Sequence, residues 1–188
     1  SESLSNGFIT RFDDNLELVD MLEAKMYVIN IDDEIIVNSE LNQSINTTAQ
    51  PIVVGNNGLR YENIYSGIDL DIKLLNHKRK LDYVIKENSF LDDLPSDATY
   101  LIFEEKMSFP ENLKPLMADN GAINLVDKDD ELIAVIPFPT MHDSSFEKLN
   151  DDDFPHIYYK LIEDNDFYKL QLHFSLDWIR NANRIFPV

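Results

Sequence analysis

Hydrophobic and polar residues alternate along much of the chain with the period of two that is typical of strands with one buried face. The alternating segments occur in pairs, each pair separated by a short polar turn. The pairs are 68–74 with 81–85, 122–126 with 131–138, and 157–161 with 168–174. Three such hairpins predict a mostly β fold with little helix, in which antiparallel sheets form a β-sandwich-like structure.

Shorter patterns extend the prediction to the remainder of the chain. Further strands are expected at residues 7–12, 25–31, 34–38 and 99–106. Residues 15–24 fit either a helical turn or another strand, and both alternatives stay open. Residues 177–183 are too short for a full helix, and we expect Trp178 to seal the edge of the core there. Because the chain has only 5 Gly, most turns have to depend on Asn and Asp.

One stretch of small polar residues, 41–50, precedes Pro51 and has the composition of a loop or linker. It provides the predicted domain boundary. Residues 1–50 are then an N-terminal β-rich subdomain or extension, and residues 51–188 are the β-sandwich-like module. The chain starts at Ser1 and not at Met, so we expect it to be a segment of a longer protein.

The composition excludes several classes of protein. With 35 Asp and Glu against 16 Lys and Arg, the net charge is −19, so we predict no direct binding of nucleic acid through a basic surface. A hydrophobic content of 44% excludes a disordered chain. No apolar run approaches the length of about 18 residues that spans a membrane. The absence of Cys excludes disulfides, thiolate nucleophiles and zinc–thiolate sites.

Acidic turns are the candidate metal ligands, because carboxylate oxygens suit calcium. These candidates are Asp127, Asp129, Asp130, Glu131, Asp151, Asp152 and Asp153. The segment after Asp127 lacks the Gly that an EF-hand loop has at its sixth position, so we expect solvated turns and no cofactor, with calcium as the alternative.

Catalytic motifs are missing from the sequence. It contains no G-x-S-x-G elbow, no H-E-x-x-H motif and no glycine-rich phosphate loop. With 35 acidic residues, some carboxylate pair always lies at a plausible spacing, so paired carboxylates indicate nothing. We predict no catalytic residue and no enzyme.

Three sequence blocks carry a resemblance. The first is YENIYSGIDL at 61–70, followed by the strand KLDYVI at 80–85. The second is IPFPTMHD at 136–143, and the third is DWI at 177–179 with RIFPV at 184–188. In this order the blocks resemble a non-repeat β-rich region of large bacterial surface and secreted proteins. These include wall-associated and Rhs/YD-repeat polymorphic toxins and secreted multi-domain proteins of Bacteroidetes.

The resemblance covers residues 59–188 and implies an extracellular β module without a catalytic residue. Its motif positions are Tyr61, Asn63, Tyr65, Gly67, Asp69, Pro137, Pro139, Asp143, Trp178, Arg184 and Pro187. We therefore expect a noncatalytic structural or interaction module of a larger secreted or cell-surface bacterial protein, whose partners are other domains of that protein or a protein or glycan.

Two alternatives stay open. The charge of −19 fits a stand-alone acidic inhibitor or nucleic-acid mimic that binds a basic partner. The aromatic residues of 158–174 and the carboxylates fit a carbohydrate-binding or carbohydrate-active domain.

Overall fold

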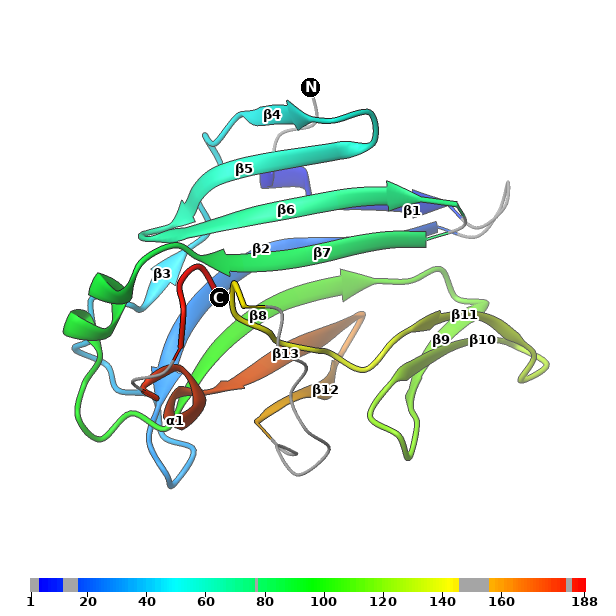
Figure 1. Cartoon of the computed structure of the whole chain (residues 1–188). Coiled ribbons are helices and arrows are strands. Elements are labelled where there is room, and N and C mark those ends of the chain that lie inside the picture. Colours follow the sequence, from blue (N-terminus) through cyan, green and yellow to red (C-terminus); the bar gives the residue numbers. More distant parts are fainter. Residues whose placement is uncertain (1–3, 12–16, 77, 146–155, 182–183) are drawn as a thin grey trace.

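A computed structural model of the chain describes all residues except 1–3, 12–16, 77, 146–155 and 182–183. The described part consists of three antiparallel sheets (Figure 1). Sheet A has the strand order β1-β2-β8-β13-β12, and β3 also pairs with β2. Its strands are β1 (Phe8–Arg11), β2 (Glu17–Ile29), β3 (Gln43–Ser44), β8 (Tyr100–Ser108), β12 (Ile157–Asp164) and β13 (Phe167–Ser175).

Sheet B stacks on sheet A, and sheet C lies beside them at one end (Figure 1). Sheet B comprises β4 (Pro51–Val54), β5 (Gly58–Tyr65), β6 (Ile68–Leu75) and β7 (Lys78–Ile85). Sheet C comprises β9 (Leu113–Met117), β10 (Ile123–Asp127) and β11 (Leu132–Ile136). The helical elements are η1 (Leu4–Asn6), η2 (Asn88–Asp93) and α1 (Leu176–Ile179). None of the helices in the described ranges is long and apolar enough to cross a bilayer.

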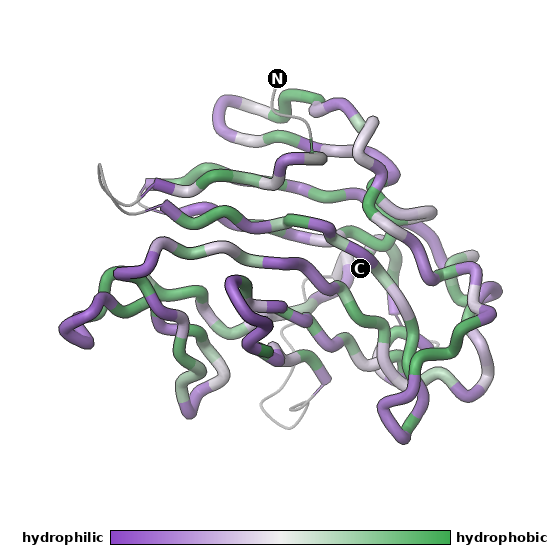
Figure 2. The backbone as a smooth tube through the Cα atoms, turned by 180° about the vertical axis from the view of Figure 1, so that it is seen from behind, coloured by the Kyte–Doolittle hydropathy of each residue, from purple (hydrophilic) through white to green (hydrophobic). Residues whose placement is uncertain are grey.

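The predicted fold class is confirmed: the chain is mostly β, its strand pairs are antiparallel, and it has little helix. The three predicted hairpins are β6–β7, β10–β11 and β12–β13. Hydrophilic residues concentrate in the connections, and hydrophobic residues lie along the strands (Figure 2). Sheet A joins strands from both sides of the boundary predicted at residue 50, because β2 pairs with β8.

The N-terminal part decides one open alternative and corrects one strand prediction. Residues 15–24 belong largely to the long strand β2, in which Met21 and Glu23 have positive φ values of 58° and 48°. The register with β8 shifts at these residues, so bulges interrupt the alternation and produce helix-like spacing. The strand predicted at 34–38 is wrong, because Ile35 makes only an isolated bridge to Ile29.

Asparagine and aspartate supply turn conformations that glycine supplies in other proteins. Asp130 and Asn165 have φ values of 61° and 53° and lie in the connections of β10–β11 and β12–β13, and Asn63, with a φ of 51°, lies within β5 at the register shift with β6. Asn and Asp tolerate the left-handed region better than other residues with a Cβ. The prediction drawn from the small number of glycines is therefore confirmed for these turns.

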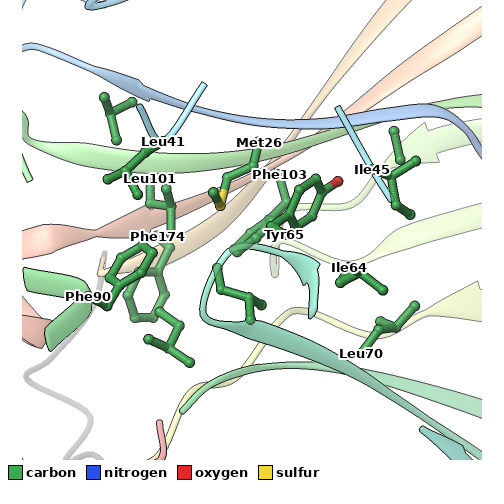
Figure 3. Packing of buried hydrophobic residues seen from close by; sticks show 14 of the residues in the cluster. Met26, Leu41, Ile45, Ile64, Tyr65, Leu70, Phe90, Leu101, Phe103 and Phe174 are labelled. Atoms are coloured by element: carbon green, nitrogen blue, oxygen red, sulfur yellow. The ribbon is translucent and has the colours of Figure 1, made fainter. Parts of the chain in front are cut away.

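The main core fills the space between sheets A and B (Figure 3). Met26, Leu101 and Phe103 face it from sheet A, and Tyr65 and Leu70 face it from sheet B. Burial of each large apolar side chain stabilises the fold by roughly 1.5–3 kcal/mol. A second cluster, which includes Met107, Ile123 and Leu125, joins sheet C to sheet A. The position of sheet C therefore depends on continuity between the two clusters along β8.

Candidate functional site

The three sequence blocks meet around the C-terminal segment, residues 184–188. The amide N of Val188 donates to the carbonyl of Ile85 at 3.0 Å, and the amide of Ile85 donates to the carbonyl of Val188 at 2.7 Å. The amide of Ser144 donates to the carbonyl of Ile185 at 2.9 Å. The hairpin of the first block is thus hydrogen-bonded to the end of the C-terminal segment. The chain at the end of the second block is hydrogen-bonded to the beginning of that segment.

Asp143 of the second block makes a side-chain hydrogen bond to the backbone of the third block. It is buried, and one of its carboxylate oxygens accepts the amide N–H of Ile185 at 3.2 Å. Its other oxygen accepts the hydroxyl and the amide N–H of Ser145. These hydrogen bonds, chiefly that of the Ser145 hydroxyl, lower the pKa of Asp143, and the charge of Arg184 lowers it further. Asp143 is therefore a carboxylate that fixes the path of the C-terminal segment.

The first block has its own charged arrangement. The carboxylate of Asp69 accepts the amide N–H of Asn63 at 2.8 Å, and Lys86 lies 3.2 Å from the same oxygen. The Nζ of Lys86 also donates to the side chain of Asn63 at 2.6 Å. Asp69 thereby stabilises the left-handed conformation of Asn63 at the register shift between β5 and β6.

The remaining motif residues are placed as follows. Tyr61 and Tyr65 are buried in the main core, and Gly67 has a φ of 75° in the turn before β6. Pro137 and Pro139 follow directly after the end of β11, and Pro187 lies in the C-terminal segment. The role of each in function stays a prediction.

Arg184 and Trp178 connect the C-terminal segment to α1. The guanidinium carbon of Arg184 lies 4.0 Å from the centroid of the Trp178 ring, and Nε of Arg184 donates to the carbonyl of Trp178 at 3.2 Å. Trp178 is buried and meets the ring of Phe174 edge-on at 5.9 Å. Trp178 therefore belongs to the main core, and its predicted role in sealing the core edge stays a prediction.

A hollow of about 570 Å³ opens beside this junction. It is lined by Asn88, Leu91, Arg180, Asn181, Arg184, Ile185 and Phe186. Arg180 was not among the predicted site residues. Its Nη1 and Nη2 donate to the carbonyls of Ala98 and Pro95 at 2.7 and 2.8 Å, which ties α1 to the turn before β8. We call this feature the arginine hollow.

The acidic turn at 127–131 is closed by hydrogen bonds within the turn. One oxygen of Asp127 accepts the amide N–H groups of Asp129 and Glu131, each at 2.9 Å. Within the ranges that the structure describes, no group of three or more His, Cys, Asp or Glu side chains could hold a metal ion. Asp151, Asp152 and Asp153 lie outside the described residues, so calcium at these turns stays a prediction.

A polar network on the outer face of sheet A was not predicted. Glu104 accepts the hydroxyl of Tyr27 and the amide of Gln171, each at 2.7 Å, and Lys25 lies 3.0 Å away. Burial alone would raise the pKa of Glu104, but the donors Gln171, Tyr27 and Lys25 outweigh it and lower this pKa. Burial lowers the pKa of His173 to about 4, and the charge of Lys160 adds to this. The lowered pKa values favour the ionised form of Glu104 and the neutral form of His173 near pH 7.

The inner face of β8 carries a second charged cluster, between the two sheets. Arg79 of β7 contacts the buried carboxylate of Asp20 in β2, and this ion pair crosses from sheet B to sheet A. Glu105 lies close to both groups. Burial raises the pKa of Glu105 well above its ordinary value, and the charge of Asp20 raises it further, against the opposing effect of Arg79. Glu105 therefore retains its proton more readily than an exposed glutamate does.

Comparison with known proteins gives a distant similarity. The chain is 24% identical over 138 residues to the "tRNA nuclease WapA" of Bacillus subtilis (strain 168). It is equally similar to the "tRNA(Glu)-specific nuclease WapA" of Bacillus subtilis subsp. natto (strain BEST195). The aligned region covers 70% of this chain and 5% of each relative. No protein-family model matches the chain, and no solved structure matches it.

These similarities correct two predictions. The sequence led us to expect a noncatalytic structural or interaction module and no enzyme, whereas both similar proteins are named as nucleases. The expectation was wrong because it rested on the absence of catalytic motifs within 188 residues. Such an absence does not report the activity of a much longer protein.

The two neighbouring acids of β8 give a testable contrast. At about pH 8 we expect Glu105→Gln to raise the free energy of unfolding by about 1 kcal/mol or more, because the raised pKa of Glu105 disfavours ionisation in the fold. The stability that protonated Glu105 contributes is complete below the ordinary pKa of 4.5 and is lost as the pH rises through the raised pKa. Urea unfolding of both proteins between about pH 5 and pH 8 measures this difference.

Glu104→Gln is the matched control on the opposite face of the same strand. This substitution should lower the free energy of unfolding at neutral pH. The pKa of Glu104 is lowered in the fold, so its ionised form stabilises the protein at pH values above the ordinary pKa of a glutamate. If both substitutions destabilise the protein equally at about pH 8, the protonated state assigned to Glu105 is wrong.

Proposed function

We propose that this chain is part of a bacterial enzyme that cleaves tRNA and that is secreted or carried on the cell surface. The observation that carries the proposal is the similarity of 70% of the chain to proteins named as tRNA nucleases. Because the chain spans only 5% of those relatives, the cleavage is proposed for the whole protein that contains it. The three sequence blocks, which in this order resemble a region of large surface and secreted bacterial proteins, are the support for the proposed location.

Within that enzyme, we place another domain of the same protein against this chain. A charge of −19 opposes an extended contact with the RNA backbone and favours a contact with a less acidic protein surface. The outer face of sheet C supports this assignment. Leu116, Leu132 and Val135 share that face, since Leu116 and Val135 pair with Asn124 and Leu132 pairs with Val126. Their exposed fractions are 36%, 58% and 45%, so we call them the apolar patch.

The cleavage is tested on the full-length protein. We expect the purified, folded protein to convert total tRNA into fragments on a denaturing gel, and a heat-denatured sample to leave the tRNA intact. Folding of the full-length protein is verified by circular dichroism. If the folded protein leaves every tRNA intact over the same period, the proposed function is wrong.

The interdomain contact is tested with Leu132→Asp in two settings. In the isolated chain we expect a change in stability within about 0.5 kcal/mol, because Leu132 is largely exposed there. In the full-length protein, the same substitution should lower the melting temperature clearly, because it places a charge in an apolar interface. Val53→Asp, at an exposed position of β4, serves as the matched control. Equal effects of Leu132→Asp in both settings would contradict the contact.

A further inference from the structure

The arginine hollow contains two cationic groups that have no carboxylate partner among the residues that the structure describes. Arg11, Arg60 and Arg79 each form an ion pair with an acidic side chain. Arg180 and Arg184 form no ion pair with any residue in the described part of the chain. In a chain with 35 acidic residues, two arginines that share one hollow without such a partner are a distinctive feature. The charge of Arg184 contributes to the lowered pKa of Asp143.

Both guanidinium groups are held in place by the fold. Two backbone carbonyls accept hydrogen bonds from Arg180, and Arg184 is stacked on Trp178 with its Nε bonded to a carbonyl. Each guanidinium has five N–H groups in total, so both have donors beyond those used in these bonds. Since their positions are fixed before any ligand arrives, an anion bound there would not have to order them.

The lining of the hollow indicates the class of anion. A planar guanidinium matches the oxygen atoms of a phosphate in a bidentate arrangement. Leu91, Ile185 and Phe186 provide apolar surface, and the side-chain amide of Asn88 provides a polar group. A volume of about 570 Å³ lies within the range of small-molecule sites, roughly 300–1,000 Å³. The two arginines of the hollow thus suit a phosphate, and its apolar lining suits a planar, partly apolar group attached to that phosphate.

We propose that the arginine hollow binds a terminal phosphate monoester of a nucleotide or of an RNA end. This inference rests on the proposed function, because hydrolysis of a phosphodiester bond by water leaves a phosphate monoester at one new end and a hydroxyl at the other. A terminal phosphate concentrates a charge of about −1.5 to −2 on one group. The acidic remainder of the chain repels an extended RNA backbone, so the hollow favours an end over the middle of a strand.

The test uses the isolated chain with adenosine 5′-monophosphate as the probe. Trp178 is the only tryptophan and lies against Arg184, so its fluorescence reports occupation of the hollow directly. We expect adenosine 5′-monophosphate to change this fluorescence saturably, adenosine to leave it unchanged, and inorganic phosphate to displace the nucleotide. Isothermal titration calorimetry measures the affinity independently of the fluorophore.

Variants locate the site. We expect Arg184→Gln to weaken binding by about tenfold or more, because it removes charged hydrogen bonds to the phosphate. Lys128→Gln removes the same charge from an exposed turn of sheet C, at the other end of the molecule, and should bind as the wild type does (Figure 1). If circular dichroism shows that Arg184→Gln does not fold, the proposal is decided by the binding of adenosine 5′-monophosphate, adenosine and inorganic phosphate to the wild-type chain.

Three results would overturn the proposal: no binding of adenosine 5′-monophosphate by the wild type, equal displacement by acetate and phosphate, or unchanged affinity of folded Arg184→Gln. Cleavage of tRNA by the full-length protein is measured separately. Cleavage without nucleotide binding would therefore overturn this inference alone, and nucleotide binding without cleavage would overturn the proposed function.

Discussion

The packing of sheet B against sheet A is the constraint on which the rest of the structure depends. Phe103, on the inner face of β8, stacks on the ring of Tyr83 at 4.0 Å between centroids and lies 5.9 Å from that of Tyr65. These contacts join β8 of sheet A to β7 and β5 of sheet B, and the buried apolar area around them supplies the main stabilisation. Because sheet C is joined to β8 through the second cluster, its position follows from the same packing.

That packing also explains why the three sequence blocks form one site. The first block ends in β7, whose last residue, Ile85, pairs with Val188. The second block follows β11 and returns to the C-terminal segment through Asp143. Stacked sheets place these distant segments at the same end of the sandwich, where the arginine hollow lies. Asp69 and Asp143 fix the backbone through their hydrogen bonds to Asn63 and Ile185, and the cationic groups at the hollow come from Arg180 and from the motif residue Arg184.

The alternation of hydrophobic and polar residues predicted the parts of the fold that are formed by strands neighbouring in the sequence. The hairpins β6–β7 and β12–β13 were predictable because one face is buried and the other solvated. The strand β2 was ambiguous because bulges at Met21 and Glu23 break the period of two. The grouping of Arg180 with Arg184 depended on the path of α1, which tertiary contacts determine. Glu104 and Glu105 gave the one overlooked signal, since two adjacent acids in an apolar strand must face different sheet surfaces.

The function illustrates a different limit of sequence patterns. The net charge predicted an acidic surface, and such a surface opposes an extended contact with RNA. It carried no information about catalysis, and the proposal of an RNA-cleaving enzyme rests on the similarity of 70% of the chain to proteins named as nucleases. An acidic β domain and an RNA-cleaving enzyme are compatible when they are parts of one chain.

Native-state hydrogen exchange at the amide of Ile85 tests the central claim most directly. This amide donates to Val188 and has a hydrogen-bond partner only if the C-terminal segment closes the sandwich. We predict that it exchanges as slowly as the amide of Leu101 in the main core, with an opening free energy close to that of global unfolding. Exchange at the rate of an unstructured peptide, while Leu101 stays protected, would contradict the convergence of the three blocks.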